Sequence, residues 1–239
     1  MVRRMLTGLV MVSGLLAFGA SADEAKVRQK LQAKLPNMVV ESVAKAPFAG
    51  LYEVVLDGEI VYTDEKADYF FGGNIFDLRT QPPKNLTQDS THRLSAKTLQ
   101  SSVGSAIKRV KGNGKRTIYT FEDPNCGFCK QLQKELAKVS DVTHYVFLIP
   151  ILGPDSHDKS RAVWCARDRV KAWDDLMLRS VGPPDGLADC STPIEKNLQL
   201  MRRFGIRGTP AVYLVNGQQI GGYLSAEKIE QALKTIGPK

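Results

Sequence analysis

A pair of cysteines, Cys126 and Cys129, constrains the fold of this 239-residue chain more than any other feature. An apolar, β-rich run over residues 118–121 precedes the pair, and apolar residues at helical spacing, Leu132 and Leu136, follow it. The pair is therefore expected to open a helix at the end of a strand. A thiol in the first turn of a helix faces unpaired backbone N–H groups and the positive end of the helix dipole, and both favour thiolate over thiol.

This position predicts a dithiol/disulfide redox centre. Cys126 is the outer thiol and the expected nucleophile. Cys129 lies one turn further along, within reach of a mixed disulfide on Cys126, and its partly buried position makes it the slower, resolving thiol. The neighbouring charges of Glu122, Asp123 and Lys130 can tune the site, although charges beside a motif are more often ordinary surface groups.

The other two cysteines, Cys165 and Cys190, are expected to form a structural disulfide. An even number of cysteines suits an oxidising compartment, and neither of these two opens a helix beside a partner thiol, as a second redox pair would. A bond between them would close a loop of about 24 residues and stabilise the fold by roughly 3 to 4 kcal/mol. A zinc site built from all four cysteines is the alternative, but such sites usually show two closely spaced pairs. We therefore expect neither a metal nor a cofactor.

The first 22 residues have the pattern of a secretory signal peptide. Arg3 and Arg4 precede an apolar run from Met5 to Phe18, and small residues from Ala20 to Ala22 follow it. We expect cleavage after Ala22 and export of the mature protein. A membrane anchor is the alternative, but the run is shorter than the ~20 apolar residues that cross a bilayer.

A small α+β domain is expected over residues 23–83. Apolar residues at every fourth position from Val27 to Leu35 predict a short helix, and several short β-rich runs follow between 38 and 78. Asp57-Gly58 is a strong hairpin signal between two of these runs. A unit of about 60 residues has little core of its own, so self-association is expected to cover its remaining apolar face. The alternative is that its sheet packs against the rest of the chain.

A linker helix is expected within residues 84–114. Apolar residues at helical spacing run from about Ser95 to Val110, with Gly104 among them. The cluster of basic residues from Lys108 to Arg116 is interpreted as a solvated face of this linker. The net charge of +8 is likewise attributed to solvated surface, because the sequence contains no nucleic-acid-binding motif and no nucleic-acid partner is expected.

Residues 115–239 have the order of elements of a thioredoxin-like domain. A strand, the cysteine helix and a second strand form the first half, and two strands joined at Asn216-Gly217 and a last helix form the second. A helical insertion is expected at about 153–204, with one helix through Val163 to Met177 and another from Ile194 to Phe204. The expected fold class is therefore α+β, with this domain joined by the linker helix to the small N-terminal domain.

A second motif, Thr209-Pro210, stands directly before an apolar strand. Proline is tolerated at the first position of a strand, and an X-Pro bond can be held in the cis form. A cis bond would turn the backbone of Thr209 toward the dithiol, where it can pair with an extended substrate chain. An ordinary trans proline in a loop is the alternative, since only a few per cent of X-Pro bonds are cis.

The motifs that carry a family resemblance are Cys126-Gly127-Phe128-Cys129, Gly208-Thr209-Pro210-Ala211, and Trp164-Cys165-Ala166 with the distant Cys190. With the hairpin-rich N-terminal unit, they resemble the DsbC/DsbG family of bacterial periplasmic thiol:disulfide interchange proteins over the whole mature chain. The resemblance implies an isomerase that rearranges wrong disulfides in misfolded exported proteins, with Cys126 as nucleophile and Cys129 as resolving thiol. Phe128 departs from the tyrosine that is common in the family, which leaves the dithiol chemistry intact.

The resemblance also implies partners. It predicts a V-shaped homodimer joined through the N-terminal units, chaperone activity, and a membrane reductase of the DsbD type that keeps the dithiol reduced. Three alternatives remain open: a DsbG-like reductase of sulfenylated cysteines, a DsbA-like oxidase, and a holdase chaperone without enzymatic activity. The oxidase is disfavoured, because a monomer would suffice for it and the N-terminal unit would have no purpose.

Overall fold

The computed structural model describes residues 21–183 and 190–236. The described chain forms two compact units, and the division falls at Gly72/Gly73, with the tip of one hairpin, Asp57–Ile60, grouped with the second unit. The expected signal peptide lies outside the described residues except for its last two positions. Among the described residues, no helix has the length and apolar character needed to cross a membrane.

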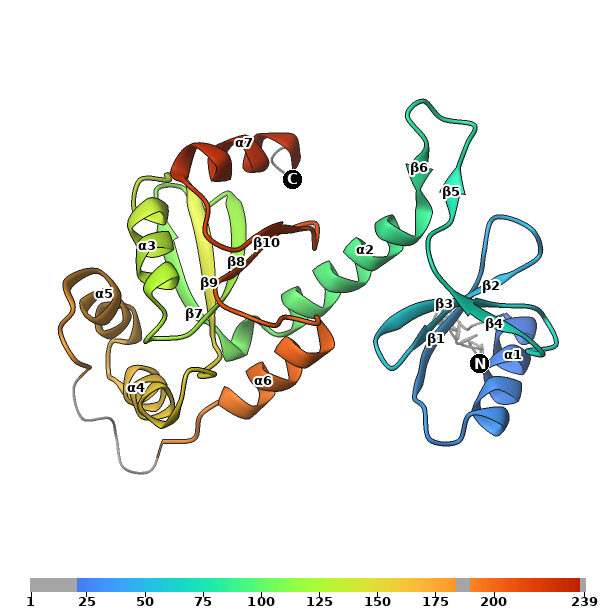
Figure 1. Cartoon of the computed structure of the whole chain (residues 1–239), viewed down its shortest axis with the longest axis horizontal. Coiled ribbons are helices and arrows are strands. Elements are labelled where there is room, and N and C mark those ends of the chain that lie inside the picture. Colours follow the sequence, from blue (N-terminus) through green and yellow to red (C-terminus); the bar gives the residue numbers. More distant parts are fainter. Residues whose placement is uncertain (1–20, 184–189, 237–239) are drawn as a thin grey trace, which may run out of the picture. The chain divides into compact units, whose positions relative to one another are not determined.

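The N-terminal unit consists of one helix and a four-stranded sheet of order β1-β2-β3-β4 (Figure 1). Its elements are α1 (Ala22–Lys34), β1 (Val40–Lys45), β2 (Tyr52–Leu56), β3 (Glu59–Thr63) and β4 (Phe70–Gly72). Asp57 and Gly58 both have positive φ, +50° and +87°, as a two-residue hairpin turn requires, and confirm the hairpin expected there. Val27 and Leu31 of α1 are buried against the sheet, whereas every residue of the edge strand β4 is exposed.

The C-terminal unit is built on a five-stranded sheet of order β11-β10-β8-β9-β7. The strands are β7 (Ile107–Lys111), β8 (Arg116–Glu122), β9 (Val142–Leu148), β10 (Ala211–Leu214) and β11 (Gln219–Gly221). Strands β8 and β9 are parallel and the other pairs are antiparallel, as expected for a βαβ half followed by a ββα half. Of the five strands of this sheet, the edge strand β7 is the one that was not predicted from the sequence.

The linker helix begins and ends earlier than expected. Helix α2 spans Leu86–Ser101, capped by the Asn85 side chain, and a 3₁₀ turn leads from it into β7. The expected helix over about 95–110 is therefore wrong in its second half, because pairing of β7 with β9 along its whole length overrides the local helical spacing. Leu99 is fully buried in the core of the C-terminal unit, so the helix is part of that unit. A short ribbon, β5 (Phe76–Asp77) with β6 (Lys84–Asn85), precedes it.

Helices cover both faces of the five-stranded sheet (Figure 1). Besides α2, they are α3 (Gly127–Leu136), α4 (Pro154–Cys165), α5 (Arg169–Arg179), α6 (Ile194–Arg203) and α7 (Ala226–Ile236). Helices α3 and α7 pack on one face, and α2 and α6 pack on the other. The insertion is helical as expected, but its first part is two helices, since Ala166 is extended and the Asp168 side chain caps α5 by accepting the backbone N–H of Lys171.

The central strand β8 separates two different environments. Tyr119 and Phe121 point into the apolar core beneath α2 and α6. Alternation along the strand places Thr120 and Glu122 on the opposite face, toward α3, and both are completely buried. Buried polar side chains need hydrogen-bond partners, so this face of the sheet must contain further polar groups.

Candidate active site

Cys126 occupies the N-cap position of α3, after the short loop of residues 123–125 that follows β8. Its backbone is extended, and its sulfur accepts the backbone N–H of Cys129 at 3.3 Å. This confirms that the pair opens a helix at the end of a strand. Both cysteines are free thiols, Cys126 is 6% exposed and Cys129 is fully buried. A thiolate on Cys126 would face the positive end of the helix dipole and keep the same N–H donor.

Thr209 meets Cys126 at the start of β10. The Cys126 thiol donates a hydrogen bond to the Thr209 carbonyl oxygen at 3.3 Å, although the two residues are 83 positions apart. The Thr209-Pro210 bond is cis, as expected. The two motifs that the sequence singled out are thus brought together at one sulfur atom.

The fully buried carboxylate of Asp123 holds the loop in front of Cys126. Its Oδ1 accepts hydrogen bonds from the backbone N–H of Asn125 at 2.7 Å and from the Ser156 hydroxyl at 2.8 Å. Its Oδ2 accepts the backbone N–H groups of Ile151 and Leu152 at 2.7 and 2.9 Å. Asp123 therefore links the active-site loop to the connection from β9 to α4 through hydrogen bonds, and it is not an exposed surface charge.

A second buried carboxylate, that of Glu122, lies on the face of β8 that α3 covers. Its Oε1 accepts hydrogen bonds from the Thr120 hydroxyl at 2.5 Å and the Gln133 side-chain amide at 2.7 Å. Its Oε2 is buried and has no hydrogen-bond partner among the described residues. Burial raises the pKa of Glu122 to about 7. Burial, together with the charge of Glu122, also raises the pKa of the Cys129 thiol.

Arg109 anchors two hydrogen-bond chains that end on Glu122. In the first, its Nη1 donates to Gln133 Oε1 at 2.6 Å. In the second, Nη1 lies 3.3 Å from His144 Nδ1, and His144 Nε2 lies 2.7 Å from Thr120 Oγ1. Burial and the charge of Arg109 hold the pKa of His144 well below its usual value, so the ring is neutral. Because Arg109 can only donate, Nδ1 must accept, and Nε2 carries the proton toward Thr120.

Arg109 is not part of a solvated linker face, as the cluster of basic residues had suggested. Its side chain is only 17% exposed, and Nη2 donates to Asp174 Oδ1 of α5 at 2.5 Å. Glu122 was predicted as a charge beside the site, whereas the residues around it were not predicted. Arg109 and His144 could have been found only from the strand pairing. In the sheet, Arg109 of β7 lies opposite His144 of β9, and His144 lies opposite Ile118 of β8.

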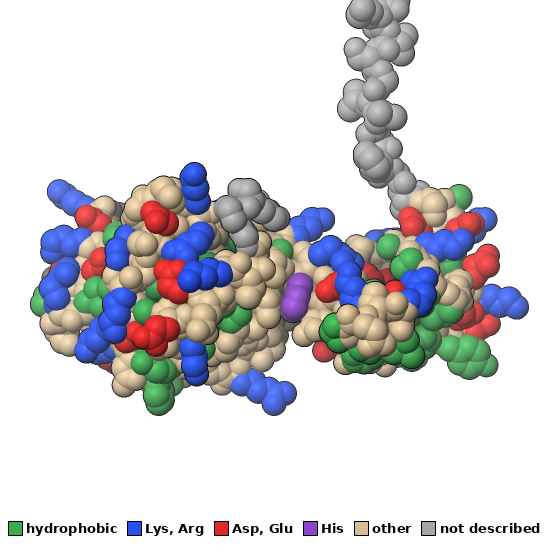
Figure 2. Space-filling model, turned by 90° about the horizontal axis from the view of Figure 1, so that it is seen from above, with side chains coloured by type: hydrophobic (Ala, Val, Ile, Leu, Met, Phe, Trp, Pro, Cys, Tyr) green, Lys and Arg blue, Asp and Glu red, His purple; other side chains and the backbone are tan. Residues whose placement is uncertain are grey.

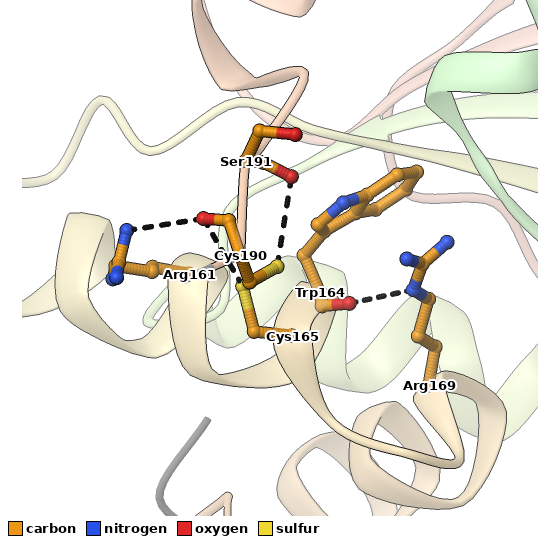
Figure 3. The surroundings of a disulfide bond; sticks show 6 residues. All are labelled: Arg161, Trp164, Cys165, Arg169, Cys190 and Ser191. Carbon is orange, nitrogen blue, oxygen red and sulfur yellow. Dashed lines mark hydrogen bonds between the residues drawn. A yellow bond between two sulfur atoms is a disulfide. The ribbon is translucent and has the colours of Figure 1, made fainter. Parts of the chain in front are cut away.

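Cys165 and Cys190 form a disulfide between the end of α4 and the segment before α6, as expected (Figure 3). Cys165 is buried, and the Arg161 guanidinium donates to the Cys190 carbonyl oxygen at 3.4 Å. The Arg169 guanidinium lies 3.9 Å from the centre of the Trp164 ring next to the bond. With these two sulfurs bonded to each other, they are not thiolate ligands for a zinc ion shared with Cys126 and Cys129.

Apolar side chains stand exposed around the dithiol. Phe128, between the two cysteines, is 61% exposed, and its ring centre lies 6.4 Å from that of Tyr223, which is 43% exposed. Leu152, held by Asp123, is 54% exposed. These residues offer apolar surface to a chain that approaches Cys126.

Comparison with known proteins connects this geometry to a family. Residues 103–237 match the model of a thioredoxin-like domain, and residues 18–88 match that of the disulfide bond isomerase protein N-terminal domain. The probable thiol:disulfide interchange protein DsbC of Bordetella parapertussis is 38% identical over 208 residues, which cover 87% of this chain and 73% of that protein. The chain belongs to the DsbC family.

Other relatives agree with this assignment to the DsbC family. DsbC of Escherichia coli is 29% identical over 96% of both chains. The crystal structure of a disulfide interchange protein from Neisseria gonorrhoeae, 38% identical, superposes with a TM-score of 0.54 and covers 58% of this chain and 99% of that one. The expected α+β fold with a thioredoxin-like domain is confirmed, and the chain is a thiol-disulfide oxidoreductase of the DsbC type.

Proposed function

We propose that this chain is a periplasmic disulfide isomerase in which Cys126 attacks wrong disulfides of misfolded exported proteins. One observation carries the proposal: the Cys126 sulfur lies between the start of α3 and the Thr209 carbonyl, in a chain that also has the N-terminal domain of disulfide bond isomerase proteins. The signal-peptide pattern of residues 1–22 supports export.

In the proposed mechanism, the Cys126 thiolate attacks a substrate disulfide and forms a mixed disulfide, releasing one substrate sulfur as thiolate. That thiolate attacks another disulfide of the substrate, and the rearrangement ends by releasing Cys126 with no net electron transfer. When rearrangement stalls, Cys129 attacks Cys126, the substrate leaves reduced, and the enzyme is left with a Cys126–Cys129 disulfide. A membrane reductase of the DsbD type would then return the two electrons.

The substrate chain is proposed to lie in extended form against the backbone of Thr209 and Pro210, in the loop that precedes β10. The Thr209 backbone is already in hydrogen-bond contact with Cys126, which supports this placement. The exposed Phe128, Leu152 and Tyr223 supply an apolar surface that suits unfolded rather than native chains. Chaperone activity toward such chains would use the same surface.

The mature protein is proposed to be a homodimer joined through its N-terminal units. Hydrophobic side chains gather on the surface of this unit (Figure 2). Its edge strand β4 exposes Phe70 by 52% and Phe71 by 42%, and the preceding Tyr69 by 77%. An unpaired strand edge with aromatic side chains is a ready site for a second copy.

Light scattering at micromolar concentration is therefore expected to give the mass of a dimer, and Phe70→Asp to shift it toward the monomer, because a charge replaces an apolar contact. Val181→Asp is the matched control, since Val181 is 52% exposed in the C-terminal unit, and it should remain dimeric. A monomer mass for the unmodified protein would exclude the dimer.

The function is tested with two substrates, a small secreted protein carrying wrong disulfides and a protein carrying a sulfenylated cysteine. The isomerase should restore activity to the first in a catalytic manner, whereas a DsbG-like reductase would act mainly on the second. The Cys126→Ala/Cys129→Ala double variant should lose this activity. If the double variant still gave the full protective effect, the protein would be a holdase rather than an enzyme.

A further inference from the structure

Three residues near the start of helix α4 hold the residue that directly precedes Cys126. The Nδ2 group of Asn125 donates hydrogen bonds to Asp155 Oδ2 at 2.7 Å and to Ser156 Oγ at 3.0 Å. Its amide oxygen, Oδ1, accepts a hydrogen bond from the Lys159 ammonium group at 2.8 Å. Both polar atoms of the Asn125 side chain thus have partners on a single helix, 30 to 34 positions further along the chain.

The contacts of Asn125 form a closed network with the charges of α4. Lys159 Nζ also donates to Asp155 Oδ2 at 2.7 Å, so the amide, the ammonium group and the carboxylate each bond to the other two. The hydrogen bonds from Lys159 and Asn125 hold the pKa of Asp155 below its usual value, which keeps the carboxylate ionised. Because Asp155 then only accepts and Lys159 only donates, the orientation of the Asn125 amide is fixed.

The network reaches the turn that leads to Cys126 at a second point. The fully buried Ser156 hydroxyl, which accepts from Asn125, donates to Asp123 Oδ1 at 2.8 Å. The backbone N–H of Cys126 donates to the Asp123 carbonyl oxygen at 3.1 Å, which closes a turn over residues 123–126 with Pro124 at its second position. Helix α4 therefore holds this turn through the side chains of two of its four residues.

The two redox forms of the dithiol depend on this turn to different degrees. In the oxidised form, the covalent bond to Cys129 keeps Cys126 at the first turn of α3. In the reduced form, the Cys126 sulfur is held there only by the backbone of the turn and by two hydrogen bonds of 3.3 Å, to the Cys129 N–H and the Thr209 carbonyl. That position favours the thiolate, so contacts that hold the turn stabilise the reduced form more than the disulfide.

We infer that Asn125 and Lys159 are positioning residues that hold Cys126 at the start of α3 and thereby favour the reduced, reactive dithiol. The inference rests on the proposed function in one respect, that Cys126 is the reactive thiol. Asn125 acts through the backbone that it shares with Cys126, and Lys159 acts through the Asn125 side chain. The helical insertion then helps to set the redox equilibrium of a dithiol that lies outside it.

The equilibrium with glutathione tests this role without a protein substrate. One reduced protein and one glutathione disulfide give the Cys126–Cys129 disulfide and two reduced glutathione molecules, which take up the two electrons and the two thiol protons. Asn125→Ala is expected to shift this equilibrium about five-fold toward the protein disulfide, because all three hydrogen bonds from its side chain to α4 are lost. The variant keeps the charges of Asp155 and Lys159, so the shift reports position rather than charge.

The Lys159 variants test the second residue against a matched control. Lys159→Met should shift the equilibrium about two-fold in the same direction, and Lys159→Arg, which keeps a donor for Asn125 Oδ1, should restore most of it. Lys171→Met is the control, since Lys171 forms an i,i+4 ion pair with Asp175 on α5 at 2.6 Å. Among the described residues, neither member of that pair is hydrogen-bonded to the turn, and the equilibrium should stay unchanged.

Unfolding in urea separates positioning from a general structural role. Asn125→Ala should destabilise the reduced protein more than the oxidised protein, and the ratio of the two changes in the unfolding constant should equal the shift measured with glutathione, because the four states form a closed cycle. The rate at which iodoacetamide alkylates Cys126 at pH 7 should also fall about three-fold, since the thiolate is less favoured. A general structural role would lower the stability of both redox forms equally.

An unchanged glutathione equilibrium in Asn125→Ala, or an equal loss of stability in its two redox forms, would overturn the inference. So would a shift in Lys171→Met as large as that in Lys159→Met. None of these measurements uses a substrate with wrong disulfides. A protein that shows the expected shifts but repairs no such substrate would refute the proposed function and retain the role of Asn125 and Lys159, whereas an active isomerase without the shifts would do the reverse.

Discussion

Replacement of Cys126 by Ser is expected to lower both disulfide reduction and isomerisation by roughly a thousand-fold or more, since the attacking sulfur is lost. Cys129→Ser should keep the first attack and lose the resolving step. Covalent complexes with substrate should therefore accumulate on Cys129→Ser and be absent from Cys126→Ser, as seen on non-reducing gels. Buried Cys129 cannot substitute, because its sulfur is fully enclosed.

The control for this pair is Phe128→Tyr, which adds a hydroxyl group to an exposed ring between the cysteines and leaves both thiols in place. Its activity should stay within about two-fold of the unmodified protein, because an exposed hydroxyl group needs no partner. If complexes instead formed through Cys129 in the Cys126→Ser variant, the two roles would have to be exchanged.

Asp123→Ala is expected to cost about 4 kcal/mol of unfolding free energy, the largest effect on stability that we predict. It removes a buried acceptor of four hydrogen bonds, and their donors are left without it: the Ser156 hydroxyl and the backbone N–H groups of Asn125, Ile151 and Leu152. Urea unfolding at fixed protein concentration, followed by the fluorescence of Trp164 and Trp173, measures the change. Activity should fall as well, because the loop that positions Cys126 loses its anchor.

Two further variants make this prediction specific. Asp123→Asn retains one acceptor oxygen of the same shape, so about half of the loss is expected. Asp158→Ala removes an exposed carboxylate from the adjoining helix α4 and should change stability by less than about 0.5 kcal/mol. Equal losses for Asp123→Ala and Asp158→Ala would show that Asp123 has no special structural role.

The parts of the fold that the sequence predicted correctly depend on local signals. The cysteine pair follows a β-rich run and precedes a helical pattern. Asp57-Gly58 indicates a hairpin turn, because both residues of such a turn need positive φ. Strand β7 was missed because Ile107 and Val110 fit a helical stripe by spacing, and their true partners on β9 lie more than thirty positions away. The spacing of apolar residues within one segment does not indicate which distant strand that segment pairs with.

The candidate site divides in the same way. The cysteines and Thr209-Pro210 are recognisable as motifs, whereas Arg109, His144 and Asp174 share no motif with them. Arg109 and His144 connect to Glu122 only because three neighbouring strands place their side chains on one face beneath α3, and Asp174 of α5 then binds Arg109. The division of the insertion into α4 and α5 was missed because the break covers only residues 166–168, with Ala166 and Asp168 extended, inside an otherwise helical spacing.

The contact between Cys126 and Thr209 has a consequence for the folding of the newly made chain. It joins residues 83 positions apart, on either side of the helical insertion, and non-local contacts of this kind form late in folding. A chain that has not yet folded already carries both thiols, but the Thr209 backbone does not yet lie beside them. The unfolded chain therefore has reactive thiols before it has the Thr209 backbone that selects an extended substrate, and only the folded protein has both.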